Sequence, residues 1–463
     1  MSKTFCPLPW IHLATRPNGD VRVCCTANAS GAGKQDEKTA GLVKKDGIAM
    51  NLRDHTIEEV WNSEHMRRTR LQMLNGEIPA SCTKCFNEEA KGITSKRQWE
   101  SEEWKQRLDF DKLIASTKED GTAPVSIPYF DLRLGNLCQL KCVMCSPHDS
   151  SSWIKEWKLQ YPQYKNKDLI ADQGWDDQYD YTWYKKGSFI DSMKHQAFNI
   201  QELYFAGGEP LLIPEHYKIL EFMVDEGYAK DCNLRYNSNG LELPDKLFKL
   251  WEHFKEVRFN FSIDAYGQRN DYIRYPSKWA DIEKNLRKLD ENTKDNTVIN
   301  IACAIQLLNV GYIDELAEWK MDQGFSKINP SMFGGGIIGT HLVYLPSYLN
   351  IRVLPQKAKL WVKDKLETFI SGKKEVTTQV LPGNFVICGA KKELYTVTPQ
   401  KMKELYHLGD ITTINQPRKC VKVTRKNLQK LYNKDSIHFE PPWGGEMLAE
   451  NGDYLVLSDG GAY

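Results

Sequence analysis

Between residues 126 and 345 the chain alternates short apolar runs, which predict strands, with longer amphipathic runs, which predict helices. The strand candidates are 129–135, 202–206, 233–238, 257–264, 298–306 and 326–332. Strands that alternate with helices pair in parallel through right-handed crossovers. This part of the chain therefore predicts an α/β fold of six units, either an open doubly wound sheet or a partly closed barrel.

The predicted strands are apolar on one face only, which helps to choose between these architectures. In the fourth strand Val257, Phe259, Phe261 and Ile263 alternate with Arg258, Asn260, Ser262 and Asp264. A parallel strand that is buried on both faces is apolar throughout, and a barrel with a packed interior does not have a polar inner face. The pattern favours a partial (β/α)6 TIM-like barrel with a ligand in its lumen.

The flanking segments differ from this barrel in their residue patterns. We predict a cysteine-rich module at 1–91, a helical connector at 92–125, a linking helix within 346–371 and a small α+β region at 372–463. Residues 383–387 and 452–456 resemble each other and suggest a short repeat in that last region.

The segment 146–201, between the first two predicted strands, is far longer than an ordinary βα connection. It is rich in tryptophan and tyrosine, including Trp153, Trp175 and Trp183. A lid over the lumen and a helical hairpin with its own small core explain this composition equally well.

Composition limits the classes of partner. A chain of 463 residues exceeds the size of a single core, so several domains are expected. The net charge of +1 gives no electrostatic argument for binding nucleic acid. The sequence contains neither an apolar run of roughly 20 residues nor a signal peptide. We expect a cytoplasmic protein with no nucleic-acid or membrane partner.

In a reducing compartment, grouped cysteines are metal ligands or catalytic groups more often than disulfides, and this chain has 12 cysteines. Cys138, Cys142 and Cys145 follow directly on the first predicted strand. Three thiolates on one loop can ligate three irons of a [4Fe–4S] cubane and leave the fourth iron open. The alternative is a zinc site that takes a distant fourth ligand such as His148.

The spacing C-x3-C-x2-C after a first strand resembles the signature of the radical S-adenosylmethionine (SAM) superfamily, and further segments resemble that family in order. Gly207-Gly208-Glu209-Pro210 is similar to its GGEP segment, and Asn237-Ser238-Asn239-Gly240 to its Thr-Asn-Gly segment. Ser262-Ile263-Asp264 is similar to its Ser-x-Asp segment. The resemblance implies SAM-binding roles for Gly207, Gly208, Glu209, Pro210, Ser238, Asn239, Ser262, Asp264, Arg274 and Asn309. Met144 stands where the family usually has an aromatic residue near the adenine.

This resemblance also implies a reaction. The open iron of the SAM-binding [4Fe–4S] cluster would chelate SAM, and an electron from a flavodoxin- or ferredoxin-type donor would cleave it to a 5′-deoxyadenosyl radical that takes hydrogen from a substrate. No residue of the lumen is singled out by the sequence as a catalytic base or hydrogen donor.

The N-terminal cysteines carry a second resemblance, to SPASM or twitch modules, which hold an auxiliary [4Fe–4S] cluster. The similar segments are Cys6-Pro-Leu-Pro-Trp10, Gly19-x4-Cys24, Glu59-Val60-Trp61-Asn62-Ser63 and Cys82-x2-Cys85. The implied ligands are Cys6, Cys24, Cys82 and Cys85, with Cys25 as the rival to Cys24 and a zinc ribbon as the alternative site.

In most relatives such a module follows the barrel, whereas here it precedes it. Modules of this kind accompany enzymes that modify peptides or proteins and enzymes that dehydrogenate or cyclise small molecules. We expect a peptide or protein substrate. A small-molecule substrate and a non-catalytic zinc or iron–sulfur scaffold are the alternatives.

Overall fold

The computed structural model describes residues 2–27, 41–164, 179–186, 188–328 and 337–373, and seven short strands beyond residue 384. Side chains are described up to residue 371, apart from 160–164. The chain forms two compact units, residues 1–366 and 367–463. The finer division of the first unit stays a prediction. No described helix is both long and apolar enough to cross a membrane.

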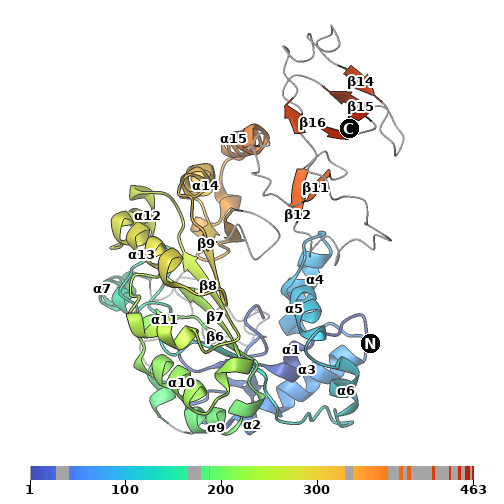
Figure 1. Ribbon diagram of the computed structural model, residues 1–463. Helices are drawn as coiled ribbons and strands as arrows, with labels where there is room; N and C mark the ends of the chain where they lie inside the picture. Colours follow the sequence, from blue (N-terminus) through green and yellow to red (C-terminus); the bar gives the residue numbers. More distant parts are fainter. Residues whose placement is uncertain are drawn as a thin grey trace. The chain divides into compact units, whose positions relative to one another are not determined.

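The first unit is built on one eight-stranded sheet with the order β10-β9-β8-β7-β6-β5-β1-β2 (Figure 1). Six of its strands pair in parallel with each neighbour: β5 (Tyr129–Leu132), β6 (Glu202–Phe205), β7 (Asn233–Ser238), β8 (Glu256–Ser262), β9 (Thr297–Ile305) and β10 (Gly339–Leu342). This confirms the predicted α/β partial barrel. Five of the six strands lie within three residues of their predicted ends.

The sixth strand differs from the prediction of 326–332. Only Ile328 of that range is described as pairing, in a single parallel bridge with Ile299, and 329–332 lie outside the described residues. The strand that pairs with β9 over four residues is β10, which has the sequence Gly-Thr-His-Leu. Its residues are exposed or half-buried, so it lacks the apolar pattern by which strands are recognised.

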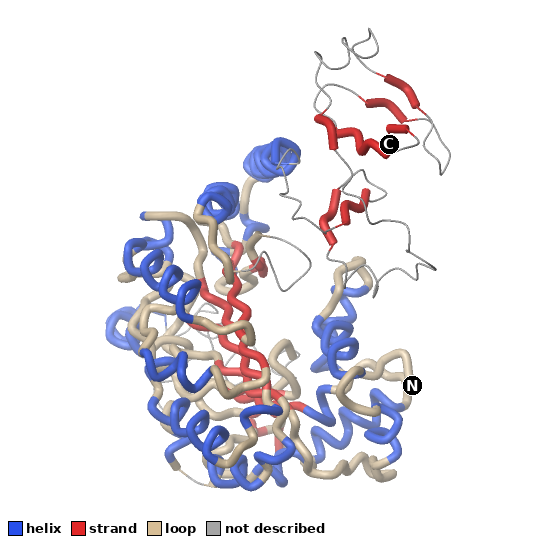
Figure 2. Tube along the Cα trace, in the orientation of Figure 1, coloured by secondary structure: helices blue, strands red, loops and turns tan. Residues whose placement is uncertain are grey.

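Helices cover the apolar face of the sheet (Figure 2). They are α10 (Pro214–Asp225), α11 (Asp245–Trp251), α12 (Gln268–Ile273), α13 (Trp279–Asn292) and α14 (Ile313–Asp322). In α13 the buried residues are Ile282, Leu286 and Leu289, whose spacing places them on one side of a helix. Phe259 and Ile301 of the sheet are 0% exposed. Each such side chain stabilises the fold by about 1.5–3 kcal/mol.

The N-terminal module extends the barrel sheet, which the sequence did not reveal. Strand β1 (His12–Thr15) pairs in parallel with β5, and β2 (Val21–Arg22) adds an antiparallel strand outside it. The module also contains α1 (Leu8–Ile11), the hairpin β3 (Lys44–Lys45) and β4 (Ile48–Ala49), α2 (Ile57–Trp61), α3 (Glu64–Leu74) and α4 (Thr83–Glu89). Arg70 of α3 is 0% exposed and donates to the carbonyl oxygens of Pro9, Trp61 and Gly121. These bonds tie the module together.

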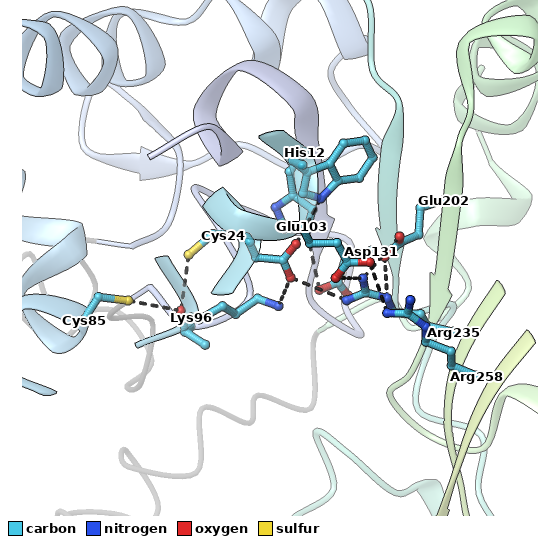
Figure 3. A network of polar contacts seen from close by, with 12 residues as sticks. His12, Cys24, Cys85, Lys96, Glu103, Asp131, Glu202, Arg235 and Arg258 are labelled. Atoms are coloured by element: carbon cyan, nitrogen blue, oxygen red, sulfur yellow. Dashed lines mark hydrogen bonds and ion pairs between the residues drawn. The ribbon is translucent and has the colours of Figure 1, made fainter. Parts of the chain in front are cut away.

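The predicted connector forms α5 (Lys96–Lys105) and α6 (Phe110–Ala115). A buried ion-pair network binds α5 to the polar face of the sheet (Figure 3). Arg235 lies 2.6 Å from Glu103 and 2.5 Å from Glu202, and Arg258 lies 3.0 Å from Glu103. Removing one partner of a buried pair leaves an uncompensated charge and costs about 3–5 kcal/mol. Because these residues stand near the starts of β6, β7 and β8, α5 covers the amino-terminal end of the lumen.

Aromatic residues of the segment 146–201 contact neighbouring parts of the first unit. The segment contains α7 (Ile154–Tyr164) and α9 (Phe189–His195). The Trp183 side chain is 0% exposed and donates to the Pro17 carbonyl oxygen at 3.0 Å. Gly19 has φ +89° and lies against this indole, where a Cβ atom would meet it at 2.6 Å. Trp175 lies outside the described residues.

The second unit begins within helix α15 (Gln356–Lys373), which overlaps the helix predicted within 346–371. Its described elements are the pair β11 (Phe385–Cys388) and β12 (Leu394–Val397), the pair β14 (Ile437–Phe439) and β15 (Met447–Ala449), and a sheet of β13 (Cys420–Lys422), β16 (Tyr454–Ser458) and β17 (Gly461–Ala462). The two copies of the suggested repeat contribute β11 and β16. The helix expected after the first copy lies outside the described residues, and the repeat stays a prediction.

Candidate functional site

The loop that carries Cys138, Cys142 and Cys145 lies at the carboxyl end of β5 and is held by backbone hydrogen bonds. The Lys141 amide donates to the Tyr275 carbonyl oxygen at 2.6 Å, and the Val143 amide donates to that of Ile273 at 2.9 Å. The indole of Trp153 donates to the Cys142 carbonyl oxygen at 3.0 Å. These positioning contacts join residues far apart in the chain, so no local sequence pattern predicts them.

The three thiols of this loop converge. Cys142 is 5% exposed, and its side chain shares a hydrogen bond with Cys145. That hydrogen bond and the Arg274 guanidinium, which lies 3.9 Å from the Cys142 sulfur, lower the pKa of Cys142. Asn239 lies 3.8 Å from the Cys138 sulfur. Three convergent thiols, one of them favoured as thiolate, are the donor set that an iron–sulfur cubane requires.

The segment Gly207-Gly208-Glu209-Pro210 is pressed against this cysteine loop. The Glu209 amide donates to the Leu137 carbonyl oxygen at 2.6 Å. Gly208 has φ +54°, and a Cβ atom there would meet the Leu137 carbonyl oxygen at 2.6 Å. Only glycine combines that backbone conformation with so close an approach.

The Glu209 carboxylate joins the ends of two strands. It is 1% exposed and accepts hydrogen bonds from the Ser238 hydroxyl and the Asn239 amide, both at 2.7 Å, and from the Leu211 amide at 3.1 Å. Burial raises the pKa of Glu209 to about 7 in spite of these donors. A further donor from a ligand, such as the amino group of SAM, would offset the cost of burying this charge. The residues therefore fit the ligand that the sequence implies.

This raised pKa predicts a pH dependence of SAM binding. The carboxylate of Glu209 must be ionised to accept hydrogen bonds from the amino group, and below its pKa of about 7 binding has to displace a proton. We expect the affinity for SAM to rise about tenfold between pH 6 and pH 8. In Glu209→Gln the affinity is expected to fall and this pH dependence to disappear, as measured by calorimetry on the reconstituted protein.

The control for this prediction is Glu221→Gln, on the exposed side of α10. It is expected to keep both the affinity and the pH profile of the unchanged protein. A Glu209→Gln variant that binds SAM with that same affinity and profile would refute a role for this carboxylate.

Asp264, Arg274 and Asn309 form a second cluster at the ends of β8 and β9. The Arg274 guanidinium lies 2.8 Å from the Asp264 carboxylate, which also accepts a hydrogen bond from the Ala304 amide at 2.8 Å. Asn309 donates to the Asp264 and Ala304 carbonyl oxygens and accepts from the Gln306 amide. Through these hydrogen bonds, the Asn309 side chain stabilises the loop that follows β9. Pairing of Arg274 with the SAM carboxylate, and contact of Asn309 with adenine, stay predictions.

Ser262 and Met144 are half-buried, Ser262 on the polar face of β8 and Met144 in the cysteine loop. His148, the fourth ligand in the zinc alternative, is buried and its Nδ1 lies 3.2 Å from the Tyr181 hydroxyl. Burial, together with Arg16, Arg22 and Arg133, lowers its pKa.

The four N-terminal cysteines Cys6, Cys24, Cys82 and Cys85 line one small cavity. The Thr26 hydroxyl lies 3.5 Å from the Cys24 sulfur and 4.0 Å from the Cys85 sulfur. Burial and the neighbouring Cys24 raise the pKa of Cys6, of Cys82 and of Cys85. Binding to iron would overcome this preference for the thiol form.

Cys25 lies apart from these four. Burial raises the pKa of Cys25 to about 12, and its charged neighbours include Lys96 and Asp131 as well as Cys24. Cys24 lines the cavity that Cys6, Cys82 and Cys85 also line, whereas Cys25 is not among the residues of its lining. The geometry therefore favours Cys24 over Cys25 as a ligand. Among the described residues, no three His, Cys, Asp or Glu side chains are grouped around a point that could hold a single metal ion.

Comparison with known families agrees with this arrangement. The model of the radical SAM superfamily matches residues 132–319, and the model of the iron–sulfur cluster-binding domain SPASM matches residues 6–86, together more than half of the chain. Residues 132–319 therefore carry a radical SAM domain, and residues 6–86 carry a SPASM domain. The SAM-binding cluster and SAM are the cofactors of a radical SAM domain, and a SPASM domain adds auxiliary iron–sulfur ligation.

Several solved structures resemble the chain at low identity. The native enzyme anSMEcpe with bound AdoMet is 15% identical, with a TM-score of 0.32, over 52% of this chain and 60% of that one. Streptococcus suis SuiB bound to S-adenosylmethionine is 14% identical, with a TM-score of 0.33, over 72% of this chain and 67% of that one. SuiB bound to its precursor peptide SuiA gives 14% identity and a TM-score of 0.33, over 73% and 66%. No curated protein matches the chain.

Proposed function

We propose that the protein is a radical SAM enzyme that uses two [4Fe–4S] clusters to remove a hydrogen atom from a peptide or protein side chain. Cys138, Cys142 and Cys145 would hold the SAM-binding cluster. Cys6, Cys24, Cys82 and Cys85 would hold the auxiliary cluster. The observation that carries the proposal is the convergence of the three loop thiols beside the buried Glu209 carboxylate, at the carboxyl ends of parallel strands.

When bound, the cluster supplies one electron that cleaves SAM to methionine and a 5′-deoxyadenosyl radical, which takes a hydrogen atom from the substrate. The chain's own residues position the participants. Glu209 orients the SAM amino group, and Asp264 holds the Arg274 guanidinium 3.9 Å from the Cys142 sulfur. Helix α5 closes the amino-terminal end of the lumen, so a substrate enters from the carboxyl ends of the strands.

A rim of exposed tyrosines supports a peptide as the substrate. Tyr272, Tyr275, Tyr344 and Tyr348 are 46–68% exposed and follow the carboxyl ends of β8 and β10. The Lys84 ammonium of α4 lies 5.3 Å from the centre of the Tyr344 ring, so the module borders the same rim. Exposed aromatic groups beside a lumen suit an extended chain, since each offers a large contact area and a hydroxyl.

The test is substrate-dependent formation of 5′-deoxyadenosine. We expect peptides encoded beside the gene to raise it above the level seen with SAM and reductant alone, and to gain a modification detectable by mass spectrometry. If small metabolites raise the formation of 5′-deoxyadenosine and no peptide does, the peptide assignment is wrong. The cytoplasmic location and the flavodoxin- or ferredoxin-type electron donor also stay predictions.

A further inference from the structure

Three arginines share the polar face of neighbouring strands at the edge where the module joins the barrel. Ala14 of β1 pairs with Arg22 of β2 on one side and with Asp131 of β5 on the other, so these three side chains point to the same face. Arg16 is two residues beyond Ala14, and Arg133 is two residues beyond Asp131. Both lie just past the ends of these strands, and both interact with Asp149, as Arg22 does. We call Arg16, Arg22 and Arg133 the arginine cluster.

The arginine cluster has more donors than protein acceptors. Arg133 donates to the Asp131 carboxylate at 2.7 Å and to the Thr15 carbonyl oxygen at 3.1 Å. Arg22 donates to the Ala27 carbonyl oxygen at 2.7 Å, while its Nε is buried with no partner. Arg16 is 8% exposed, and within the described part of the chain its side chain makes no hydrogen bond or ion pair.

Beside the arginine cluster, the His148 ring adds a buried nitrogen that can donate or accept a hydrogen bond. It is 4% exposed, and its Nε2 has no partner among the described residues, whereas Nδ1 meets the Tyr181 hydroxyl. Burial and all three arginines lower the pKa of His148, which keeps the ring neutral. Unsatisfied polar groups that are buried together indicate a site for a polar ligand.

The arginine cluster and the acids beside it carry a net charge of +1. Among the described residues, the acids that face the cluster are Asp131 and Asp149, and Asp149 interacts with all three arginines. Lys96 is already neutralised by Glu100 at 2.6 Å. Three guanidinium groups against two carboxylates therefore match a ligand that carries one negative charge. Guanidinium forks bind carboxylates through two parallel hydrogen bonds.

The arginine cluster also borders the proposed SAM site. A Cβ atom at Gly207 would lie 2.7 Å from the Arg133 Cβ atom, so this side chain packs directly against the Gly207-Gly208-Glu209 segment. On the other side, Arg22 stands only two residues before Cys24 of the module. A ligand held here lies between the two sets of cysteines, where a substrate of the proposed reaction must lie.

We infer that Arg16, Arg22 and Arg133 bind a carboxylate of the substrate, an Asp or Glu side chain or a chain terminus, and hold the substrate beside the SAM site. The inference rests on the proposed function for the identity of the ligand as the substrate. The arginine cluster itself is independent of any redox chemistry, so its binding is measured separately from SAM cleavage.

The test is calorimetric titration of the reconstituted full chain with N-acetylglutamate α-amide, with N-acetylglutamine α-amide and with inorganic phosphate. We expect the glutamate probe to bind about tenfold or more tightly than the glutamine probe, because only the glutamate probe can form charged hydrogen bonds with the guanidinium groups. Arg22→Gln and Arg133→Gln are each expected to weaken the binding of the glutamate probe about tenfold or more. Arg22→Lys keeps the positive charge but loses the paired hydrogen bonds of a guanidinium group. Its affinity for the glutamate probe is therefore expected to lie between the affinities of Arg22→Gln and of the unchanged protein.

The matched control is Arg287→Gln, an exposed arginine of α13 that pairs only with the surface groups Glu283 and Gln323. It is expected to leave the affinity unchanged. Equal affinities for the two amino-acid probes, tighter binding of phosphate than of the glutamate probe, or cluster variants of unchanged affinity would each overturn the inference.

Iron content and far-ultraviolet circular dichroism, measured on the same variants, are expected to match the unchanged protein and show that each variant is folded. An unchanged protein that binds the glutamate probe but does not cleave SAM would refute the proposed function and leave the carboxylate site standing.

Discussion

Cys142→Ser is expected to abolish the formation of 5′-deoxyadenosine and to lower the iron content from about eight to about four per chain. Cys142 is 5% exposed, and its sulfur is the one that Arg274 and Cys145 favour as thiolate. A serine hydroxyl is a poor ligand for iron, so the SAM-binding cluster is lost while the N-terminal cysteines are untouched. The measurements are chromatographic quantitation of 5′-deoxyadenosine under reducing conditions and an iron assay.

The matched control is Cys232→Ala, because Cys232 is a fully buried thiol at the start of β7 that belongs to neither cysteine group. This variant is expected to keep both iron content and SAM cleavage. SAM cleavage by Cys142→Ser at the rate of the unchanged protein would refute the ligand assignment.

The second large effect concerns two adjacent cysteines. Cys24→Ser is expected to remove about four irons per chain, whereas Cys25→Ser is expected to remove none. Cys24 shares a cavity with Cys6, Cys82 and Cys85, and Cys25 faces Lys96 and Asp131 instead. Iron quantitation and electron paramagnetic resonance of the reduced clusters distinguish the two variants.

Each variant of this pair is the control for the other, since both replace a cysteine by serine in the same turn. Loss of iron in Cys25→Ser with full iron in Cys24→Ser would reverse the assignment. Loss of one or two zinc ions, with no iron in the unchanged protein, would replace the auxiliary cluster by the zinc alternative.

Much of the barrel and of the candidate site could be predicted from the sequence because the signals are local. The alternation of Val257, Phe259 and Phe261 with polar residues fixes which face packs on helices. Cys138, Cys142 and Cys145 follow a strand that the apolar pattern reveals. Glu209 and Ser238 end neighbouring parallel strands, which by itself places them together, and the structure joins them by a hydrogen bond of 2.7 Å.

The features that escaped prediction depend on pairings between distant residues. The polar alternation of β1 is too short to show that His12 pairs with Tyr129 and that the module continues the barrel sheet. The network of Glu103, Arg235 and Arg258 joins the connector to two strands. In the sequence these residues look like ordinary charged surface. The arginine cluster cannot be recognised in the sequence for the same reason, because its residues come together only through the pairing of β1 with β2 and with β5.

Anaerobic reconstitution of the full chain, followed by incubation with SAM and a strong reductant, tests whether the protein cleaves SAM at one of two iron–sulfur clusters. We expect about eight irons per chain and the formation of 5′-deoxyadenosine together with methionine. A chain that binds zinc in place of iron, or that holds both clusters and still leaves SAM intact, would contradict this expectation.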